Sequence, residues 1–349
     1  MKILIDIGHP AHVHYFRNFI KIMESKGHQF LVIARDRQYV FDLLRAYGIG
    51  FVSRGKGGGG AISKLWYLKK TSVKQYFRAR RFKPDLFLDF GTIYSGAAGM
   101  MLRKPHLVFE DTENAGLYRL LYKPFVTEIF TPECFEKELG RKQVRFPGYM
   151  ELCYLHKNYF TPDATVLDEV GLTQGERFSI VRFVDWKAVH DIGYTGLLSD
   201  DKILLVNELK KYGKVFVSSE IPLPEELEEF RLNIKPESLH SLMHYAGLVL
   251  GESATMASEA VVVGTPAVFI DNVGRGYTTD LSRKYGNLYL YTPKHENVES
   301  IIEKAGEVFS SADAKSEALK IREQIHKDSI DVTAFMVERV VRYETDNLK

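Results

Sequence analysis

The sequence predicts an α/β protein built from two doubly wound domains, each around a parallel sheet. Short apolar runs that end at glycine or at a polar residue alternate with segments whose apolar residues recur at helical spacing, which is the pattern of strand–helix–strand units. The alternation lapses in residues 146–162, which carry Pro147, Gly148 and Pro162, and it resumes near Glu176. A chain of 349 residues also suits two domains of ordinary size.

The first domain is expected over residues 1–150. A helical pattern that follows the first apolar run ends at Gly27, and a second one ends at Gly48. Because strands and helices follow one another in strict alternation here, the segment favours a doubly wound parallel sheet. The expected strands are residues 2–8, 29–34, 49–53, 83–91, 106–110 and 128–132.

The second domain is expected over residues 151–325. Residues 326–349 are expected to form a C-terminal helix that packs back on the first domain, because their pattern is helical and mostly amphipathic. Two further helices are expected in 200–213 and 254–264. The expected strands are residues 177–183, 214–219, 247–251, 266–271 and 288–291.

Composition indicates an ordinary globular protein of a reducing compartment. Hydrophobic residues make up 45% of the chain and the net charge is +2, so the basic field typical of nucleic-acid-binding proteins is absent and no nucleic-acid partner is expected. No run of 18 apolar residues occurs, and Asp6 interrupts the first apolar run, so neither a spanning helix nor a signal peptide is expected. Cys134 and Cys153 have neither metal-ligand spacing nor a disulfide framework. These features predict a cytoplasmic location.

The stretch LVLGESATMASEAVVVGTPAVFID, residues 248–271, carries the most direct chemical signal. A strand ends at Gly251, a small polar turn follows, and a helix is expected to begin near Thr255 or Met256. The first N–H groups of a helix lack internal partners and lie at the positive end of its dipole, so small side chains there let a phosphate approach. Glu259, one turn further, is placed to reach ribose hydroxyls. An ordinary capped helix of any α/β protein would give the same spacing.

This stretch resembles the donor-binding segment of GT-B-fold enzymes, such as the transferase that adds N-acetylglucosamine in lipid II synthesis and the non-hydrolysing UDP-N-acetylglucosamine 2-epimerases. GHPAHVHYFRNFIKIMESKGHQFLVIARD (8–36) resembles their N-terminal loop and first helix, and KPDLFLDFGTIYSGAAGMMLRKPHLVFEDTENAG (83–116) resembles a later block of the same enzymes. The order of these segments is similar to an uncharacterised prokaryotic family, domain of unknown function 354, grouped with GT-B enzymes. The resemblance implies a GT-B-like α/β fold, with two Rossmann-like domains facing a central cleft.

The resemblance also implies a nucleotide-sugar substrate, UDP-linked in the families named, and no cofactor. Arg182, at the end of a predicted strand, is the side chain expected to neutralise a diphosphate. The residues predicted to bind the nucleotide-sugar are Gly8, Arg182, Ser218, Glu252, Ser253, Ala254, Thr255, Met256 and Glu259.

Three histidines follow the first strand, in GHPAHVH. They have no standard zinc spacing, and on a helix that begins near His12 the side chains of His12 and His14 point about 200° apart, so no metal site is expected. The resemblance to GT-B transferases implies acceptor- or base-type groups on this loop, and a neutral imidazole is a suitable base near pH 7. His12 is therefore the preferred catalytic base and His9 the second choice. Alternatively, both rings only hydrogen-bond backbone groups of the turn.

An acidic loop, FEDTENAG at 109–116, follows another predicted strand. Clustered carboxylates can act as acids or bases, so Glu110 and Asp111 join the catalytic candidates. The epimerases carry a functional glutamate that would correspond to Glu110. Asp111 and Glu113 could instead hold a cation or cap the loop.

Three departures from known patterns narrow the predicted chemistry. The HRREN-type stretch of the epimerases should fall near 181–191, where this chain has Arg182 and His190 but not the motif, which weakens an epimerase reading. Six residues separate Glu252 from Glu259, where retaining GT-B transferases typically have seven, which favours inversion. No Asp-x-Asp occurs, so a metal-dependent GT-A mechanism is not expected.

A basic segment precedes the fourth predicted strand. RGKGGGGAISK (54–64) lacks the Lys-Ser/Thr pair of a P-loop and predicts a glycine-rich loop. Residues 64–83 then hold eight Lys and Arg, beside Trp66 and other apolar side chains. Such a segment is either a solvated helix face or a peripheral contact with the inner face of an anionic membrane.

The predicted function is an inverting, metal-independent glycosyltransferase that moves a sugar from a nucleotide-sugar donor to an acceptor hydroxyl on a glycan or lipid-linked acceptor, in surface polysaccharide or cell-envelope synthesis. The alternatives are a non-hydrolysing UDP-sugar 2-epimerase and a non-catalytic protein that binds nucleotide-sugars.

Overall fold

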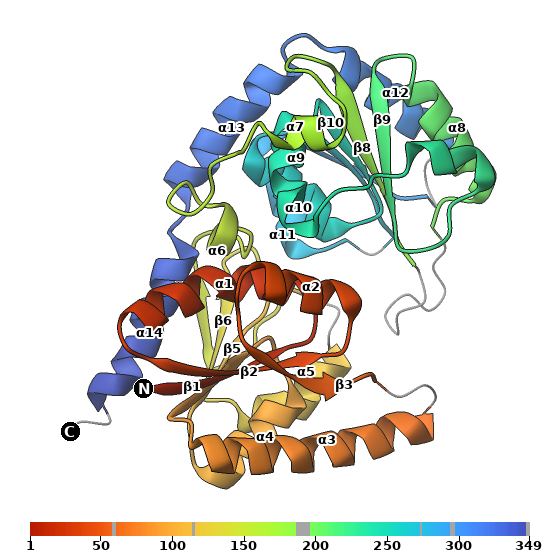
Figure 1. Ribbon diagram of the computed structural model, residues 1–349. Coiled ribbons are helices and arrows are strands. Elements are labelled where there is room, and N and C mark those ends of the chain that lie inside the picture. The colour runs from red at the N-terminus through yellow and green to blue at the C-terminus, as the bar shows by residue number, and fades with distance from the viewer. Residues whose placement is uncertain (58–60, 114–115, 186–195, 273, 294–296, 347–349) are drawn as a thin grey trace. The chain divides into compact units, whose positions relative to one another are not determined.

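Figure 1 shows the computed structural model of the chain, which describes residues 1–57, 61–113, 116–185, 196–272, 274–293 and 297–346. The chain divides into two compact units: Met1–Tyr159 with Ser329–Lys349, and Phe160–Asp328. Each unit holds one fully parallel sheet with helices packed on it, so the predicted pair of Rossmann-like α/β domains is confirmed. The first unit extends to Tyr159, beyond the predicted end at residue 150.

The first unit holds a seven-stranded sheet in the order β3-β2-β1-β4-β5-β6-β7. Its strands are β1 (Lys2–Ile7), β2 (Gln29–Arg35), β3 (Phe51–Gly55), β4 (Leu86–Asp89), β5 (His106–Phe109), β6 (Glu128–Pro132) and β7 (Gln143–Phe146). Its helices are α1 (Pro10–Ser25), α2 (Gln38–Ala46), α3 (Ala61–Phe82), α4 (Ile93–Leu102), α5 (Gly116–Tyr122), the 3₁₀ helix η1 (Lys123–Phe125), α6 (Leu152–Leu155) and α14 (Val332–Asp346).

Strand β7 was not among the predicted strands. It is the edge strand of the sheet, and of its four residues only Phe146 is buried. An edge strand of this kind has no continuous apolar run, so periodicity does not reveal it.

The stretch 146–162, predicted to hold the domain boundary, does contain the end of the first unit at Tyr159, but most of the stretch packs into the interior of that unit. The run from Tyr149 to His156 is buried, and α6 packs against α1 and α14. The carbonyl of Cys153 accepts hydrogen bonds from Asn18 Nδ2 and Thr333 Oγ1, each 2.8 Å long. The proline and glycine residues of this stretch therefore mark turns within a packed segment, and the chain leaves the unit only after Tyr159.

The second unit holds a five-stranded sheet in the order β12-β11-β10-β8-β9, with all five predicted strands present. Its strands are β8 (Phe178–Phe183), β9 (Lys214–Ser219), β10 (Leu248–Gly251), β11 (Ala267–Ile270) and β12 (Leu288–Tyr291). Its helices are α7 (Val166–Glu169), α8 (Ser199–Leu209), the 3₁₀ helices η3 (Glu225–Phe230) and η4 (Pro236–Ser238), α9 (Leu239–Tyr245), α10 (Ala254–Val263), α11 (Gly276–Tyr285), α12 (Val298–Ser310) and α13 (Ala314–Asp328).

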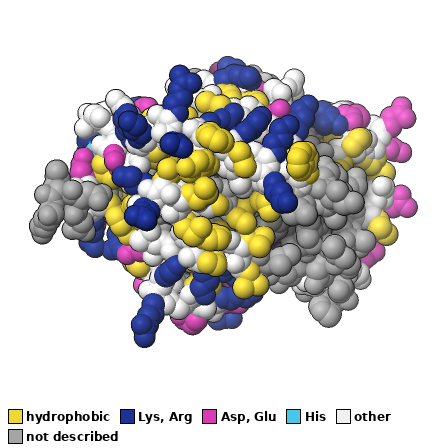
Figure 2. All heavy atoms as spheres, turned by 90° about the horizontal axis from the view of Figure 1, so that it is seen from below, with side chains coloured by type: hydrophobic (Ala, Val, Ile, Leu, Met, Phe, Trp, Pro, Cys, Tyr) yellow, Lys and Arg dark blue, Asp and Glu magenta, His cyan; other side chains and the backbone are white. Residues whose placement is uncertain are grey.

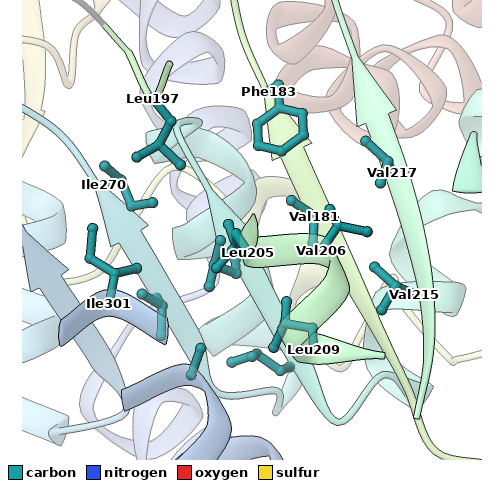
Figure 3. Close-up of a cluster of buried hydrophobic side chains, with 14 of the residues drawn as sticks. Val181, Phe183, Leu197, Leu205, Val206, Leu209, Val215, Val217, Ile270 and Ile301 are labelled. Carbon is teal, nitrogen blue, oxygen red and sulfur yellow. The ribbon is translucent and has the colours of Figure 1, made fainter. Parts of the chain in front are cut away.

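An apolar cluster between the sheet and two helices forms the core of the second unit (Figure 3). Val181 and Phe183 from β8 meet Leu205 and Leu209 from α8, and Ile301 comes from α12. Because β8 is the second strand from one edge and is covered on this face, its side chains form a nearly continuous apolar run, as parallel strands require. This packing fixes the carboxyl end of β8, where candidate site residues lie.

The C-terminal region forms two helices, where one was predicted over 326–349. Helix α13 ends at Asp328 in the second unit, and α14 begins at Val332 in the first unit, where it packs against α1. Asp331 starts the new helix, since its Oδ1 accepts a hydrogen bond of 2.9 Å from the backbone N–H of Ala334. An aspartate at this position caps a helix, and the chain therefore breaks between the two amphipathic segments.

Helix α3 is long and strongly basic. Its 22 residues include seven Lys and Arg and no acidic residue. Across the described ranges, every helix, α3 included, is too short or too polar to span a bilayer.

Candidate functional site

The second unit places its candidate site at the point where strand order reverses. The chain runs from β8 to the neighbouring β9 and then returns to the other side of β8 as β10. In open α/β sheets, ligands bind at the carboxyl ends of strands beside such a reversal. The segment that follows β10, which carries most of the predicted nucleotide-sugar residues, starts there, and Arg182 lies at the end of β8.

Helix α10 opens directly after β10. Ser253 caps it, since Ser253 Oγ accepts from the backbone N–H of Met256 at 3.4 Å, and the helix begins at Ala254, one residue before the predicted Thr255. Ala254 is buried and Thr255 is half-buried, so small side chains surround the first turn. Met256 is buried, so it can offer a ligand its backbone only. The first turn of α10 therefore combines small side chains with the N-terminal N–H groups of a helix, a setting of the kind that binds phosphate.

Gly251 lets β10 and β8 meet closely beneath this turn. A Cβ atom at this position would lie 2.2 Å from the carbonyl oxygen of Arg182. Only glycine fits so close an approach of two backbones, so the start of α10 depends on this residue.

Glu252 was predicted to bind the ligand, but the structure gives its carboxylate to the backbone. Its Oε2 accepts from the N–H of Val184 at 3.1 Å, and its Oε1 accepts from the N–H of Leu197 at 2.7 Å. These two residues flank the segment 185–196, so Glu252 ties both ends of that segment to the end of β10. A buried carboxylate with two charge-assisted hydrogen bonds is costly to displace, which disfavours the predicted ligand contact of Glu252.

Glu259 lies one turn into α10 and is buried. Its Oε1 lies 3.0 Å from Nε2 of His240, which is also buried and comes from α9. His240 was not predicted. The pair fixes the orientation of the Glu259 carboxylate behind the first turn of α10.

Arg182 and Ser218, predicted separately, are brought together by the pairing of β8 with β9. Arg182 Nη1 donates to Ser218 Oγ at 2.7 Å, and its Nη2 donates to Glu220 Oε1 at 2.5 Å. The Arg182 side chain is only 19% exposed, so its guanidinium is held at the carboxyl edge of the sheet. His190 lies outside the described residues.

In the first unit, the histidine loop joins β1 to α1. His9 is exposed and caps α1, where its Nδ1 accepts from the N–H of Ala11 at 3.2 Å. Gly8 donates its backbone N–H to Nδ1 of His12 at 3.3 Å. Both histidines thus hydrogen-bond a backbone group of the turn, and Gly8, predicted to bind the nucleotide-sugar, lies in the first unit as part of this turn.

His12 combines an apolar surrounding with a fixed tautomer. Its ring stacks on Phe90 at 4.7 Å between centroids and lies 6.2 Å from the ring of Tyr15. Burial, followed by the neighbouring His9, lowers the pKa of His12 to about 3. Because Nδ1 accepts from Gly8, the proton of the neutral ring sits on Nε2. His12 therefore presents a hydrogen-bond donor to a ligand, which disfavours the predicted role as catalytic base.

His14 faces a different part of the first unit. It is buried, its Nδ1 lies 3.3 Å from the hydroxyl of Tyr47, and its ring stacks on Tyr154 at 5.1 Å. The angular separation between His12 and His14 thus puts one beside the carboxyl edge of the sheet and the other in the helix packing.

Two of the three acidic side chains in the loop after β5 accept hydrogen bonds from neighbouring residues of the first unit. Glu110 is buried against Arg119, whose Nε donates to its Oε1 at 2.9 Å, and against the hydroxyl of Tyr122. Burial raises the pKa of Glu110, and Arg119 opposes that shift. Glu113 is also buried, and its Oε1 accepts from the N–H of Glu136 at 3.3 Å. Both carboxylates shape the loop, so the structure argues against Glu110 as the catalytic acid or base.

Asp111 is the acid of this loop that remains partly accessible. Its Oδ2 accepts from the hydroxyl of Tyr15 at 3.3 Å and its Oδ1 from Thr112 Oγ1 at 2.9 Å. Tyr15 also stacks on Phe90 at 4.8 Å, and Phe90 carries the ring of His12. The fold therefore brings Asp111 and His12, which lie 99 positions apart in the sequence, to the same aromatic group.

A buried charged network lies beneath this group and was not predicted. Asp6 and Asp89 are partners in the register of β1 and β4, and both are fully buried. Arg54 forms an ion pair with Asp6, and His106 Nε2 lies 3.0 Å from Asp89 Oδ2. Burial raises the pKa of Asp6 despite Arg54. Burial would also raise the pKa of Asp89, but His106 and hydrogen bonds from Thr92 bring it below its ordinary value.

The sequence did contain a signal for this network. Asp6 interrupts an otherwise apolar run, and Asp89 does the same in LFLDFG. Charged residues inside buried strands are rarely tolerated without partners, so each predicts a counter-charge nearby. Which cation supplies it could not be known before the strands were paired.

Metal ligation finds no support in the part of the chain that the structure describes. Within those residues, no three His, Cys, Asp or Glu side chains gather closely enough to hold a metal ion.

Comparison with solved structures defines the class of fold. UDP-GlcNAc 2-epimerase from Neisseria meningitidis, solved with UDP-GlcNAc bound, is 13% identical, with a TM-score of 0.68 over 98% of this chain and 100% of that one. MurG from Acinetobacter baumannii is 14% identical, with a TM-score of 0.61 over 98% of this chain and 99% of that one. The chain thus has the fold of GT-B glycosyltransferases and UDP-GlcNAc 2-epimerases, as its sequence predicted.

The chain belongs to the family described as Protein of unknown function (DUF354), which matches residues 1–344. The predicted resemblance to this family is confirmed. An uncharacterised protein from Methanocaldococcus jannaschii is 22% identical over 284 residues, covering 77% of this chain and 81% of that protein.

Proposed function

We propose that this protein is a glycosyltransferase that moves a sugar from a nucleotide-sugar donor to an acceptor hydroxyl, with inversion at the anomeric carbon. The observation that carries the proposal is the first turn of α10 beside the strand-order reversal of the second unit. The helix is capped, its first turn carries small residues, and it follows Gly251, where only glycine fits against β8. Such a helix start suits the diphosphate of a nucleotide-sugar donor.

Arg182 would complete the diphosphate site. Its guanidinium is fixed at the end of β8 by Ser218 and Glu220, and its backbone lies against Gly251 of β10. A fixed guanidinium and helix N–H groups stabilise the negative charge that develops on a leaving diphosphate without reorganising during the reaction.

Glu259 would bind the ribose hydroxyls, with His240 as its positioning residue. A carboxylate that is already oriented by a 3.0 Å contact needs little further ordering when it receives a hydroxyl. Since Glu259 is buried behind the first turn of α10, the ribose must approach that turn closely.

The first unit would bind the acceptor and supply the base. In the proposed step, the acceptor oxygen forms a bond to the anomeric carbon as the bond from that carbon to the diphosphate oxygen breaks. The acceptor proton passes to the carboxylate of Asp111, which is partly accessible and held by Tyr15. His12 would orient the acceptor by donating from Nε2, as its hydrogen bond from Gly8 requires.

The proposal also covers the donor and the biological setting. Two of the proteins with a similar fold are a UDP-GlcNAc 2-epimerase and MurG. UDP-linked hexosamines are therefore the first donors to test. A metal-independent reaction is proposed because the chain lacks Asp-x-Asp. Glycan synthesis for the cell surface or envelope is the corresponding setting.

A panel of nucleotide-sugars, with and without glycan and lipid-linked acceptors, tests the proposal. Acceptor-dependent release of nucleotide would support a transferase, and Asp111→Asn should abolish most of it. Isomerisation of the sugar without acceptor would replace the proposal with a UDP-sugar 2-epimerase, which the TM-score of 0.68 to the Neisseria enzyme makes the second candidate. Binding without either reaction would indicate a non-catalytic nucleotide-sugar-binding protein.

A further inference from the structure

One side of α3 exposes large apolar side chains. Trp66, Val73 and Phe77 are 68%, 55% and 61% exposed. Successive helix residues turn by about 100°, so these three lie within about 40° of one another around the helix. They line up along one side of the helix as an apolar stripe that no described part of the chain covers. The opposite side of α3 is buried and carries Thr71, Gln75 and Ala79.

Basic residues flank this stripe on both sides. Lys69 and Arg80 lie about 40–60° to one side of Trp66, and Lys70, Lys74 and Arg81 about 40–80° to the other. All five are exposed, and α3 contains no acidic residue. An amphipathic helix of an ordinary domain turns its apolar side inward, but here the apolar stripe points outward and is bordered by positive charge.

The neighbouring helices extend the same surface. Helix α4 packs against α3 and also against α5. Met100 and Met101 of α4 are 54% and 60% exposed, and Leu120 of α5 is 70% exposed. Neither α4 nor α5 contains an acidic residue, and Arg103 follows α4 as an exposed cation. Figure 2 shows hydrophobic side chains gathered on this face, with Lys and Arg around them.

We propose that this face, the α3–α5 face, docks on the surface of an anionic lipid bilayer. Contiguous exposed apolar patches with a polar rim mark interaction sites, whereas isolated exposed residues do not. Tryptophan, phenylalanine and leucine insert into the boundary between headgroups and acyl chains, and lysine and arginine pair with anionic headgroups. The charge complementarity selects the lipid surface.

Two other occupants fit less well. A second copy of the chain would bring its own acid-free face against this one, so the basic rims would repel each other. Nucleic acid would satisfy the positive rim, but its phosphate backbone offers nothing to the apolar stripe at the centre.

The buried side of α3 holds the docking face rigidly to the sheet. Gln75 Nε2 donates to Asp6 Oδ2 at 2.9 Å and to Ser95 Oγ at 3.0 Å. Since Asp6 stands near the end of β1, one residue before the strand's last position, the docking helix is fixed to the strand that leads into the histidine loop. Docking would therefore hold the first unit in a defined orientation on the bilayer. The proposal does not depend on the proposed transferase activity.

Vesicle sedimentation with the full-length protein tests the docking. Vesicles that contain phosphatidylglycerol in phosphatidylcholine should bind at least tenfold more protein than phosphatidylcholine alone, and added salt should weaken the binding. The double substitution Lys70→Gln with Lys74→Gln should weaken it about 30-fold, at roughly fivefold for each cation near a membrane surface. Trp66→Ser with Phe77→Ser should cost at least tenfold through lost apolar burial.

Matched exposed positions elsewhere provide the controls. Lys21→Gln on α1 and Tyr39→Ser on α2 change exposed residues of the same unit away from the face and should leave vesicle binding unchanged. All these positions are exposed, so the variants should keep the melting temperature of the wild type.

Fluorescence gives an independent readout. The chain has two tryptophans, Trp66 and Trp186, so a Trp186→Phe variant reports on Trp66 alone. Its emission should shift to shorter wavelength with phosphatidylglycerol vesicles, because the indole leaves water. Equal binding to both kinds of vesicle, an unshifted emission, or tighter binding to duplex DNA than to vesicles would each overturn the proposal.

Discussion

The two units complete the carboxyl edges of their sheets in opposite ways. The first unit uses side-chain charge, with Asp6 and Asp89 buried side by side and compensated by Arg54 and His106. The second unit uses the backbone, with the capped first turn of α10 following Gly251.

This difference bears on the role proposed for each unit. A network of buried charges holds the groups above it in fixed positions, which suits the orientation of an acceptor and the transfer of a proton. Free helix N–H groups carry partial positive charge, which suits an anionic diphosphate. In the second unit Glu252 supports the backbone through two N–H groups, and Glu259 faces the His240 side chain.

The largest expected effect concerns turnover in the first unit. Asp111→Asn should lower turnover by about 10²–10⁴-fold with near-normal donor affinity, because a general base contributes in that range. His12→Ala should cost less, since its Nε2 is a donor. Single-turnover kinetics, with donor affinity measured separately, would check this. A severe loss in His12→Ala alongside an active Asp111→Asn would restore His12 as the base.

The second prediction breaks the charged network itself. Arg54→Met should leave Asp6 buried without its cation beside Asp89, at a cost of about 3–5 kcal/mol in the free energy of unfolding. Urea denaturation would measure it. Arg80→Met, at an exposed position of α3, is the control and should change stability by less than about 0.5 kcal/mol. Equal stability in the two variants would show that the network is not energetically coupled.

The third prediction concerns nucleotide affinity in the second unit. Glu259→Gln should weaken nucleotide binding by about 1–3 kcal/mol, the range for hydrogen bonds to a charged group. Calorimetry with UDP and UDP-sugars would measure the change. Glu307→Gln, on an exposed part of α12, should bind as the wild type does. An unchanged affinity in a folded Glu259→Gln protein would remove Glu259 from the site.

The fourth prediction is a pH dependence. The pKa of His12 lies at about 3, below its value of about 6.5 in an unfolded chain, so above pH 6.5 the ring is neutral in both states and has no effect. As the pH falls from 6.5 toward 3, the unfolded chain takes up a proton that the folded protein refuses, and stability falls. The loss should reach about 1–2 kcal/mol by pH 5.

His12→Gln should remove this part of the acid sensitivity, as denaturation curves at pH 7 and pH 5 would show. His244 in the second unit, whose pKa burial lowers to about 4, should contribute separately and leave the variant still acid-sensitive. Turnover should not fall near pH 6.5 on account of His12. A histidine-like loss of turnover at that pH would contradict the low pKa.

The smallest expected effect is that of a chelator. Turnover should be unchanged after treatment with EDTA, since neither the Asp-x-Asp pattern nor a ligand cluster in the described residues offers a metal site. Activity lost in EDTA and restored by magnesium or manganese would contradict the proposed mechanism and direct attention to Asp111 and Glu113.

Sequence reasoning located the candidate site by segment more reliably than by side chain. The turn after β10 and the loops after β1 and β5 all lie at the carboxyl ends of strands. Within those segments, Glu110 and Glu252 were expected to meet ligands but are bound to partners inside the fold. A carboxylate looks the same in a sequence whether its partner is a substrate or a neighbouring N–H group.

The sequence by itself determined the architecture. Apolar strands alternate with amphipathic helices in two separate stretches, and this local pattern predicts one doubly wound sheet in each stretch. The sequence also determined the start of α10, since Ser253 caps the helix through the N–H of its own neighbour Met256. Only the tertiary structure decided that Asp6 meets Arg54 and that Asp111 joins His12 around Phe90. Those contacts depend on which strands pair and in which register. Strand pairing therefore also sets the partner of each buried charge, and that partner decides whether the charge is structural or reactive.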